Sequence, residues 1–254
     1  MMVQLNCDLG ESFGAWSMGD DAAVMAFIDE ANIACGFHAG DPLTMEKTIA
    51  LAKAHDVAIG AHPAYPDLEG FGRRSMALSE QEVYSNVLYQ VGALSAFCRA
   101  QGVALRYVKP HGALYHDLLI QDATFRGVVR AIADFDATLP LVILAQQNPS
   151  HWQEQAAKYG VELRFEAFAD RTYEDDGRLR SRREPGAVLL EPAQIVAQAL
   201  QIAQFGTVTT YSGHTIALSA DTLCVHGDTP SALDAVKQIR TALDALRTSA
   251  GEGI

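Results

Sequence analysis

Short apolar runs alternate along the chain with longer stretches in which apolar residues recur at helical spacing. This alternation is typical of βα units, which assemble into a parallel sheet. Residues 31–35 and 141–145 are almost continuously apolar, as expected of strands that helices cover on both faces. The pattern predicts seven strands, at residues 3–9, 31–37, 57–61, 105–109, 141–145, 162–168 and 222–226.

Helices are predicted between the strands, and some of them have clear start signals. Ser79 followed by Glu82 forms a capping-box pattern at the start of a helix over residues 79–100. Asp41-Pro42 places proline in the first turn of another helix, and a further helix is predicted near residues 192–205.

Two segments interrupt the alternation. Residues 171–187 are polar and contain glycine and several arginines, which predicts a long loop. Loops of this length inside a compact fold often carry function. Residues 207–218 hold two short β-rich runs around Gly213, which predicts a small hairpin inserted before the last strand.

Length and composition narrow the class of protein. The chain has 254 residues, about what one α/β barrel needs, so we expect a single barrel domain over residues 1–254. With 49% hydrophobic and 20% charged residues it can bury a large core without disulfide or metal staples. The formal net charge of -12 repels phosphate backbones and anionic lipid, which argues against a nucleic-acid or membrane-surface partner.

Cysteine usage and the N-terminal residues suggest a compartment. No C-x-x-C pair or other short metal-ligand spacing links the four cysteines, Cys7, Cys35, Cys98 and Cys224, so buried reduced thiols are expected. Asp8 and Glu11 come before any apolar stretch of signal-peptide length, and no apolar run is long enough for a membrane-spanning helix. We therefore expect a cytoplasmic protein.

Titratable residues follow almost every predicted strand, just past its apolar run. Because the carboxyl ends of parallel strands open on one face of a barrel, where barrel enzymes place their active sites, these residues are expected to converge. His38, His62, His111 and His226 repeat the pattern, which favours a shared site over four separate capping roles. The candidate catalytic residues are Asp8, Glu11, His38, His62, Lys109 and His111.

These residue types fit two kinds of chemistry. Asp8, His38 and His62 from adjacent strands make a plausible ligand set for a divalent metal with open positions. The same groups serve equally well as proton donors and acceptors, so the residues leave both possibilities open. Burying Lys109 is costly unless its ammonium meets carboxylates or a substrate anion, so either its pKa or its partner is expected to be functional, with a structural Lys–Asp pair as the alternative.

Arginines near the strand ends could bind an anion, because guanidinium binds carboxylate and phosphate in a bidentate manner. The candidate substrate-binding residues are Arg73, Arg74, Asp170, Arg171, His226 and Asp228. A second arginine group is expected to lie in a solvated loop or a docking surface: Arg178, Arg180, Arg182 and Arg183. The sequence has no G-x-x-x-x-G-K-[ST] loop, no G-x-G-x-x-G after a strand and no G-x-S-x-G elbow, so it shows no recognisable nucleotide site of its own.

Six motifs stand in order along the chain, including NCDLGESFG at residues 6–14 and VKPHGALY at 108–115. The others lie at 31–42, 60–74, 166–171 and 225–228. Together they resemble the LamB/YcsF family, the group of 5-oxoprolinase A subunits, and the resemblance covers essentially the whole chain.

The resemblance implies an irregular seven-stranded (β/α) barrel of the glycoside hydrolase/deacetylase type. It also implies an enzyme that acts with partner subunits B and C to open 5-oxo-L-proline to L-glutamate with hydrolysis of ATP. ATP would bind through the partner subunits, which accounts for the missing phosphate loop, and it could phosphorylate the lactam oxygen before water attacks the activated carbon. The six candidate catalytic residues would bind this lactam, position water and stabilise the oxyanion.

Two other function classes remain open. One is a self-sufficient, metal-dependent amide hydrolase or deacetylase, which the histidines favour. The other is a non-catalytic subunit that binds a carbohydrate or an amide. Neither alternative accounts for all six motifs together.

Overall fold

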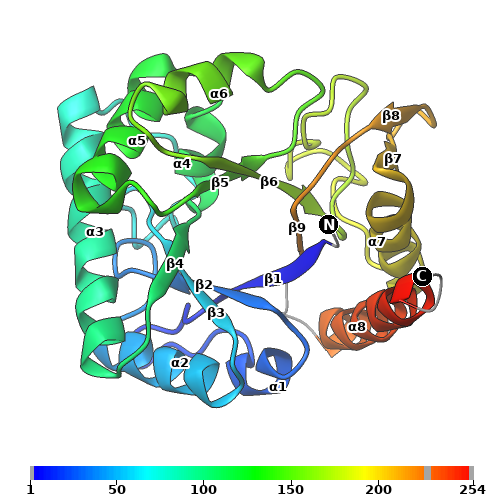
Figure 1. Cartoon of the computed structure of the whole chain (residues 1–254), viewed down its shortest axis with the longest axis horizontal. Coiled ribbons are helices and arrows are strands. Elements are labelled where there is room, and N and C mark those ends of the chain that lie inside the picture. Colours follow the sequence, from blue (N-terminus) through cyan, green and yellow to red (C-terminus); the bar gives the residue numbers. More distant parts are fainter. Residues whose placement is uncertain (1–2, 226–229, 252–254) are drawn as a thin grey trace.

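The computed structural model describes residues 3–225 and 230–251. Seven parallel strands form a closed barrel: β1 (Gln4–Leu9), β2 (Glu30–Ala34), β3 (Ala58–His62), β4 (Leu105–Val108), β5 (Leu141–Leu144), β6 (Leu163–Phe168) and β9 (Thr222–Cys224). The strands follow one another around the ring, and β9 closes it by pairing with both β6 and β1 (Figure 1). The predicted seven-stranded barrel is confirmed.

The observed strands are mostly shorter than predicted. The largest difference is at β2, which ends at Ala34 rather than at residue 37. Gly36 has a φ of 97°, a conformation open to glycine and unfavourable for other residues, and it turns the chain away from the sheet. The apolar residues Cys35 and Phe37 extend the sequence pattern past the real end of the strand.

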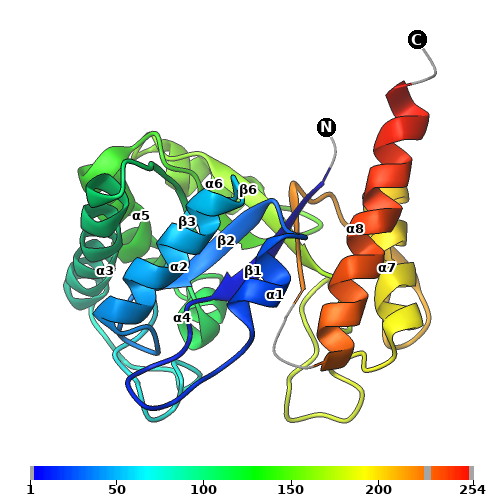
Figure 2. The same ribbon diagram turned by 90° about the horizontal axis from the view of Figure 1, so that it is seen from below.

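Helices surround the barrel: α1 (Asp21–Met25), α2 (Pro42–Ala54), α3 (Glu80–Ala100), α4 (Gly112–Asp117), α5 (Asp122–Asp136), α6 (Ser150–Ala157), α7 (Pro192–Phe205) and α8 (Pro230–Gly251). The predicted starts are confirmed, since Ser79 and Glu82 form a capping box before α3 and Asp41 caps α2. α7 and α8 pack side by side and stand apart from the α2, α3 and α5 side of the molecule (Figure 2).

The inside of the barrel is polar and closely hydrogen-bonded. The Asn32 Nδ2 atom donates to Asn6 Oδ1 at 2.7 Å and to Asp8 Oδ1 at 2.8 Å, and the Tyr107 hydroxyl donates to Asn32 Oδ1 at 2.7 Å. These side chains come from β1, β2 and β4 and bond one another, which places them in the barrel interior. Leu5, Cys7 and Leu9 alternate with them along β1 and belong to the hydrophobic core.

The predicted hairpin is present as β7 (Thr207–Thr209) and β8 (Thr215–Ala217), which pair antiparallel. It holds the long loop after β6, because Asp175 of that loop accepts hydrogen bonds from the hydroxyls of Thr210 and Ser212. His214 also contacts Asp175, at 3.1 Å between Nδ1 and Oδ2, and its side chain is 72% exposed. His214 therefore takes part in the contact between the hairpin and the long loop.

Two further expectations concern the cysteines and the membrane. All four cysteines are free and buried, as predicted. Within residues 3–225 and 230–251, no helix combines the length and the apolar character needed to cross a membrane.

Candidate functional site

The candidate catalytic residues meet at the carboxyl ends of β1 to β4. The loops that follow β1, β3 and β6 project from this same end of the barrel (Figure 2). Every one of the six residues contacts another: Lys109–Asp8 at 2.8 Å, His111–His62 at 3.0 Å, His38–Glu11 at 3.2 Å and His62–Asp8 at 3.3 Å. They form the strand-end cluster that the sequence predicts, while their catalytic roles remain predictions.

Lys109 is almost fully buried, with 2% of its side chain exposed, and its ammonium lies between two carboxylates. The Nζ atom is 2.8 Å from Asp8 Oδ1 and 2.8 Å from Glu166 Oε1, and it also donates to Asn6 Oδ1 at 3.3 Å. Burial alone would lower the pKa of Lys109, but the carboxylates outweigh it and hold the pKa well above its ordinary value. Lys109 is therefore a fixed positive charge at neutral pH and not a general base.

Glu166 is a site residue that was missing from the predicted set. Its side chain has no exposed surface, and it lies on β6 two residues before the strand ends. The sequence pattern pointed to residues just past each strand, whereas Glu166 points into the barrel from within one. The available signal was an acidic residue in the apolar second half of a strand, Phe165-Glu166-Ala167-Phe168, where a buried carboxylate needs a cation as its partner.

Two of the imidazoles have tautomers that their neighbours determine. His62 Nδ1 lies 2.7 Å from the Lys109 carbonyl oxygen, and His111 Nε2 lies 2.9 Å from the Phe71 carbonyl oxygen. Because a carbonyl only accepts hydrogen bonds, both of these nitrogens carry the proton. In the neutral rings, His62 Nε2 and His111 Nδ1 then turn lone pairs toward each other across 3.0 Å.

A cation would resolve this contact between two acceptors. Burial lowers the pKa of His38 and of His111 well below the ordinary imidazole range, and neighbouring rings lower both further. Possible ligand atoms of four residues lie within 4.8 Å of one another: Glu11, His38, His62 and His111. Three imidazoles and one carboxylate suit a first-row divalent metal.

This ligand group differs from the predicted set of Asp8, His38 and His62. Asp8 Oδ1 accepts from Asn32 and pairs with Lys109, and Asp8 Oδ2 lies 3.3 Å from His62 Nε2. The converging group instead contains Glu11 and His111. Asp8 thus lies beside the possible metal ligands and links them to the Lys109 charge.

The segment Phe71-Gly72 packs directly against the imidazoles. The rings of His38 and His111 stack at 3.8 Å between centroids, and the Phe71 ring meets both edge-on. Phe71 has a φ of 55°, which is strained for a residue with a side chain. A Cβ at Gly72 would lie 2.9 Å from both His111 Cδ2 and His38 Cβ, so only glycine allows this close approach.

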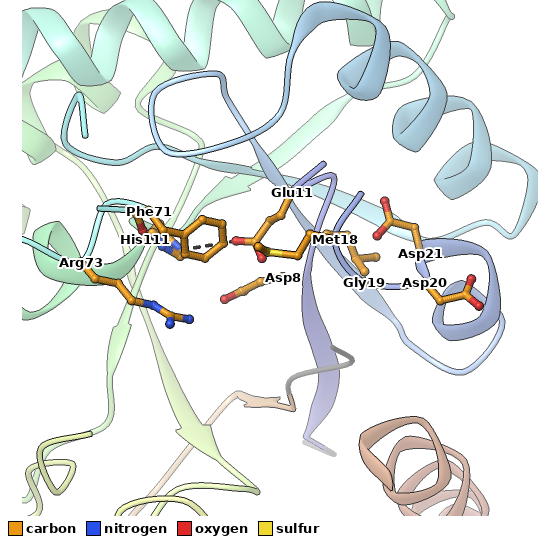
Figure 3. Close-up of a pocket in the computed structure, with 10 residues that line it drawn as sticks. Asp8, Glu11, Met18, Gly19, Asp20, Asp21, Phe71, Arg73 and His111 are labelled. Atoms are coloured by element: carbon orange, nitrogen blue, oxygen red, sulfur yellow. Dashed lines mark hydrogen bonds and ion pairs between the residues drawn. The ribbon is translucent and has the colours of Figure 1, made fainter. Parts of the chain in front are cut away.

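Two cavities open on the cluster. The smaller has a volume of about 40 Å³ and is lined by residues that include Asp8, Glu11, Asp21 and His111 (Figure 3). The larger has a volume of about 560 Å³ and joins Asp8, His62, Lys109 and His111 to the long loop after β6, where Arg171 and residues 179–183 line it. Arg73 lines both cavities, and Figure 3 shows its guanidinium reaching toward Asp8.

The predicted substrate-binding residues have different surroundings. Arg73 and Arg171 line the larger cavity. Arg74 lines neither cavity and pairs instead with Asp67, with its Nε 2.9 Å from Asp67 Oδ1. Asp170 is buried and is absent from both linings. His226 and Asp228 lie outside the described residues.

The arginines of the long loop were expected to be solvated or to form a docking surface. Arg180, Arg182 and Arg183 instead line the larger cavity. Arg178 fits the expectation, because its side chain is 76% exposed, pairs with Asp176 and is absent from the cavity lining. Arg182 and Arg183 are nevertheless exposed, so a solvated loop is not contradicted, although the loop folds back over the strand ends.

Comparison with known proteins adds an independent line of evidence. Residues 3–251 match the model of the LamB/YcsF family. A Pseudomonas aeruginosa protein, named as a 5-oxoprolinase A subunit, is 55% identical over 244 residues, which cover 96% of this chain and 97% of that protein. A Vibrio cholerae protein that is also named as the A subunit of 5-oxoprolinase is 55% identical over 242 residues, covering 95% of this chain and 98% of that protein.

A solved structure has the same fold over nearly the whole chain. The lactam utilization protein from Thermus thermophilus superposes with a TM-score of 0.90 at 44% sequence identity, covering 97% of this chain and 98% of that one. The barrel fold is thus shared with a protein whose crystal structure is known.

Proposed function

This chain belongs to the LamB/YcsF family, and on that premise we propose that it is the A subunit of an ATP-dependent 5-oxoprolinase. The reaction would open 5-oxo-L-proline to L-glutamate with hydrolysis of ATP, in a complex with partner subunits B and C. The observation that carries the proposal is full-length similarity, at 55% identity, to proteins named as 5-oxoprolinase A subunits. The strand-end cluster supports it, because it offers the groups that amide opening needs.

Ring opening requires water to add to the lactam carbonyl carbon, the C–N bond to break and a proton to reach the nitrogen. Asp8, His62 and His111 line the larger cavity, and the Asp8 carboxylate would accept the proton of the attacking water. Lys109 places a fixed positive charge 2.8 Å from Asp8. This charge would stabilise negative charge that develops near Asp8 during the reaction.

ATP would be handled by the partner subunits. The sequence contains no phosphate-binding loop of a recognised type, and a five-membered lactam is a poor electrophile that needs activation. Phosphorylation of the lactam oxygen by the partners would release ADP and activate the ring. One water would then add to the ring carbon and the C–N bond would break, which gives the acyl phosphate of glutamate, and a second water would release glutamate and inorganic phosphate. The four free, buried thiols are typical of a reducing compartment, so we place the complex in the cytoplasm.

We also propose that Glu11, His38, His62 and His111 hold a divalent metal ion. The support is the pair of lone-pair nitrogens on His62 and His111, which face each other at 3.0 Å within reach of two further ligands. When bound, such an ion polarises a carbonyl oxygen or lowers the pKa of a bound water. Asp8 would then accept a proton beside it.

Reconstitution tests the proposed function. The purified chain is mixed with 5-oxo-L-proline and ATP, with and without subunits B and C, and glutamate is measured. Glutamate should form only when all three subunits and ATP are present. Asp8→Asn should lower kcat by about a hundredfold or more, because a proton acceptor and the partner of Lys109 are both weakened. His151→Gln, an exposed change in α6 outside both cavity linings, should leave turnover unchanged.

The same experiment separates the alternatives. Glutamate formation by the chain alone without ATP would contradict the proposal and favour a self-sufficient amide hydrolase. Normal turnover by a complex that contains Asp8→Asn would indicate a non-catalytic binding role. Comparable assembly of the variant and wild-type complexes by size-exclusion chromatography ensures that lost turnover is not lost association.

A further inference from the structure

The hydroxyl of Tyr115 is a buried polar group that makes no hydrogen bond to another described residue. Tyr115 is 3% exposed and lines the larger cavity. Buried side-chain oxygens are nearly always hydrogen-bonded, because burial without a partner costs free energy. Within residues 3–225 and 230–251, Tyr115 is the only residue that has such an atom and also lines one of the two cavities. Its hydrogen-bond partner must therefore come from the cavity, as solvent or as a ligand.

The helical turn that follows His111 places Tyr115 beside the strand-end cluster. His111 is the N-cap of α4, and Tyr115 lies four residues later, which brings both side chains to the same side of the helix. Both line the larger cavity. The Tyr115 ring meets the Phe168 ring edge-on at 6.0 Å between centroids, and Lys109 Nζ lies 5.6 Å from the centre of the same Phe168 ring. The hydroxyl is thus carried by a packed ring next to the charged part of the site.

The Tyr115 hydroxyl keeps its proton at neutral pH. Burial raises the pKa of Tyr115 well above its ordinary value, and the Glu166 carboxylate raises it further by its charge and by attracting the hydroxyl proton. A protonated phenol donates a hydrogen bond and is a poor nucleophile or base. No hydrogen bond joins Tyr115 to Glu166 in the structure, and Lys109 pairs with that carboxylate at 2.8 Å. The donor is therefore available to a ligand that enters the cavity.

We propose that Tyr115 is a substrate-binding residue whose hydroxyl donates a hydrogen bond to an oxygen atom of the bound lactam. This proposal rests on the proposed function. A neutral O–H donor is matched by an oxygen lone pair, and 5-oxo-L-proline has two such groups, the ring carbonyl and the carboxylate. A site with a buried hydroxyl discriminates against ligands that lack the acceptor, because the hydroxyl then loses its solvent partner without gaining another. Tyr115 would thus determine specificity, whereas Asp8 and Lys109 serve the chemistry.

A matched control separates this role from an ordinary structural one. Tyr65 is 2% exposed and absent from both cavity linings, and its hydroxyl donates to Asp117 at 3.0 Å. Tyr65→Phe should lower the midpoint of chemical denaturation, because it takes a hydrogen bond from a buried carboxylate. Tyr115→Phe should leave the midpoint unchanged, because its hydroxyl has no bond to another described residue.

Lactam binding to the complete chain tests the proposal. 5-Oxo-L-proline is titrated by calorimetry into the wild-type protein, Tyr115→Phe and Tyr65→Phe. Tyr115→Phe should weaken binding about fivefold or more, and Tyr65→Phe should leave it unchanged. 2-Pyrrolidinone, which has the ring carbonyl but no carboxylate, identifies the acceptor. If Tyr115→Phe weakens the binding of both lactams, the hydroxyl contacts the ring carbonyl, whereas an effect on 5-oxo-L-proline alone assigns the contact to the carboxylate.

Two results would overturn the role of Tyr115 in binding. One is a wild-type protein that binds 5-oxo-L-proline no more tightly than Tyr115→Phe does, or not at all. The other is a lower denaturation midpoint for Tyr115→Phe, because the hydroxyl then has a partner inside the protein. Weaker binding at unchanged stability supports the proposal even if the reconstituted subunits form no glutamate. Normal glutamate formation with equal lactam affinity would leave the proposed function standing and reject only the role of Tyr115.

Discussion

Among the individual residue contacts, the one between His62 and His111 most restricts what the site can bind. When both rings are neutral, each donates its one proton to a backbone carbonyl, so the two remaining nitrogens are acceptors at 3.0 Å. Two lone pairs at this distance repel each other unless something positive lies close to both. Glu11 and His38 complete a group that could hold such an ion.

Metal titration of single-residue variants tests whether this group of four residues binds an ion. Zn²⁺ added to metal-stripped protein should bind at about one ion per chain, measured by equilibrium dialysis and mass spectrometry. His38→Ala, His62→Ala and His111→Ala should each weaken binding about tenfold or more, because each removes a ligand. Asp8→Asn should have a smaller effect, which distinguishes the observed group from the set Asp8, His38 and His62. The prediction would be contradicted if the wild-type protein bound Zn²⁺ no more tightly than the His111→Ala variant does.

Some residues of the site could be predicted from the sequence, and others could not. Asp8, His62 and Lys109 stand at strand ends, where barrel geometry brings polar side chains together, so they could be found. Glu166 and Asn32 lie within strands, and whether their side chains face the helices or the barrel interior depends on strand register and tilt. Neither quantity is readable from a single chain, so the acid that balances Lys109 was missed.

At the scale of the element, the pairing of β3 with β4 depends on one glycine. Gly60 is the register partner of Tyr107, and a Cβ at Gly60 would lie 2.1 Å from Cε2 of that ring. The ring therefore occupies the space of a missing side chain. In this position the Tyr107 hydroxyl reaches Asn32 and joins the network that ends at Asp8.

Gly60→Ala should therefore destabilise the protein by about 1–3 kcal/mol, because the added methyl group overpacks the barrel interior. Chemical denaturation measures the change. Gly92→Ala is the matched control, since Gly92 lies in α3 with nothing within 4 Å of the added Cβ. The control should be stabilised by about 0.5–1 kcal/mol through helix propensity. Equal stability of Gly60→Ala and the wild-type protein would show that Tyr107 can move at no cost.

Element positions were more predictable than element ends. Apolar periodicity and the Ser79 capping box locate helices and strands because these signals are local. The end of β2 at Ala34 and the folding of residues 179–183 over the cavity depend on a glycine conformation and on contacts with the hairpin. Those contacts join residues far apart in the chain, so the loop was predicted but its place over the site was not.

At the scale of the whole molecule, one carboxylate joins α8 to the barrel. Asp29 Oδ2 accepts from the Leu5 amide of β1 at 2.8 Å, and Asp29 Oδ1 accepts from Arg240 of α8 at 2.9 Å. Arg247, further along α8, lies 3.3 Å from the same carboxylate. The buried face of the helix contributes Val236 and Ile239 to the core, and its charged contacts converge on Asp29.

Asp29→Asn should consequently loosen α8 without opening the barrel. The neutral amide keeps one acceptor but turns a donor toward an arginine, which removes about 1–3 kcal/mol of charge-assisted hydrogen bonding. Hydrogen exchange with mass spectrometry should show faster exchange in peptides of α8 and unchanged exchange in α3. Asp244→Asn is the matched control, because Asp244 contacts the same two arginines from within α8 and has no bond to the strand. If both variants speed up hydrogen exchange in α8 equally, the arginines act by stabilising the helix itself. The contact through Asp29 would then not be what holds α8 against the barrel.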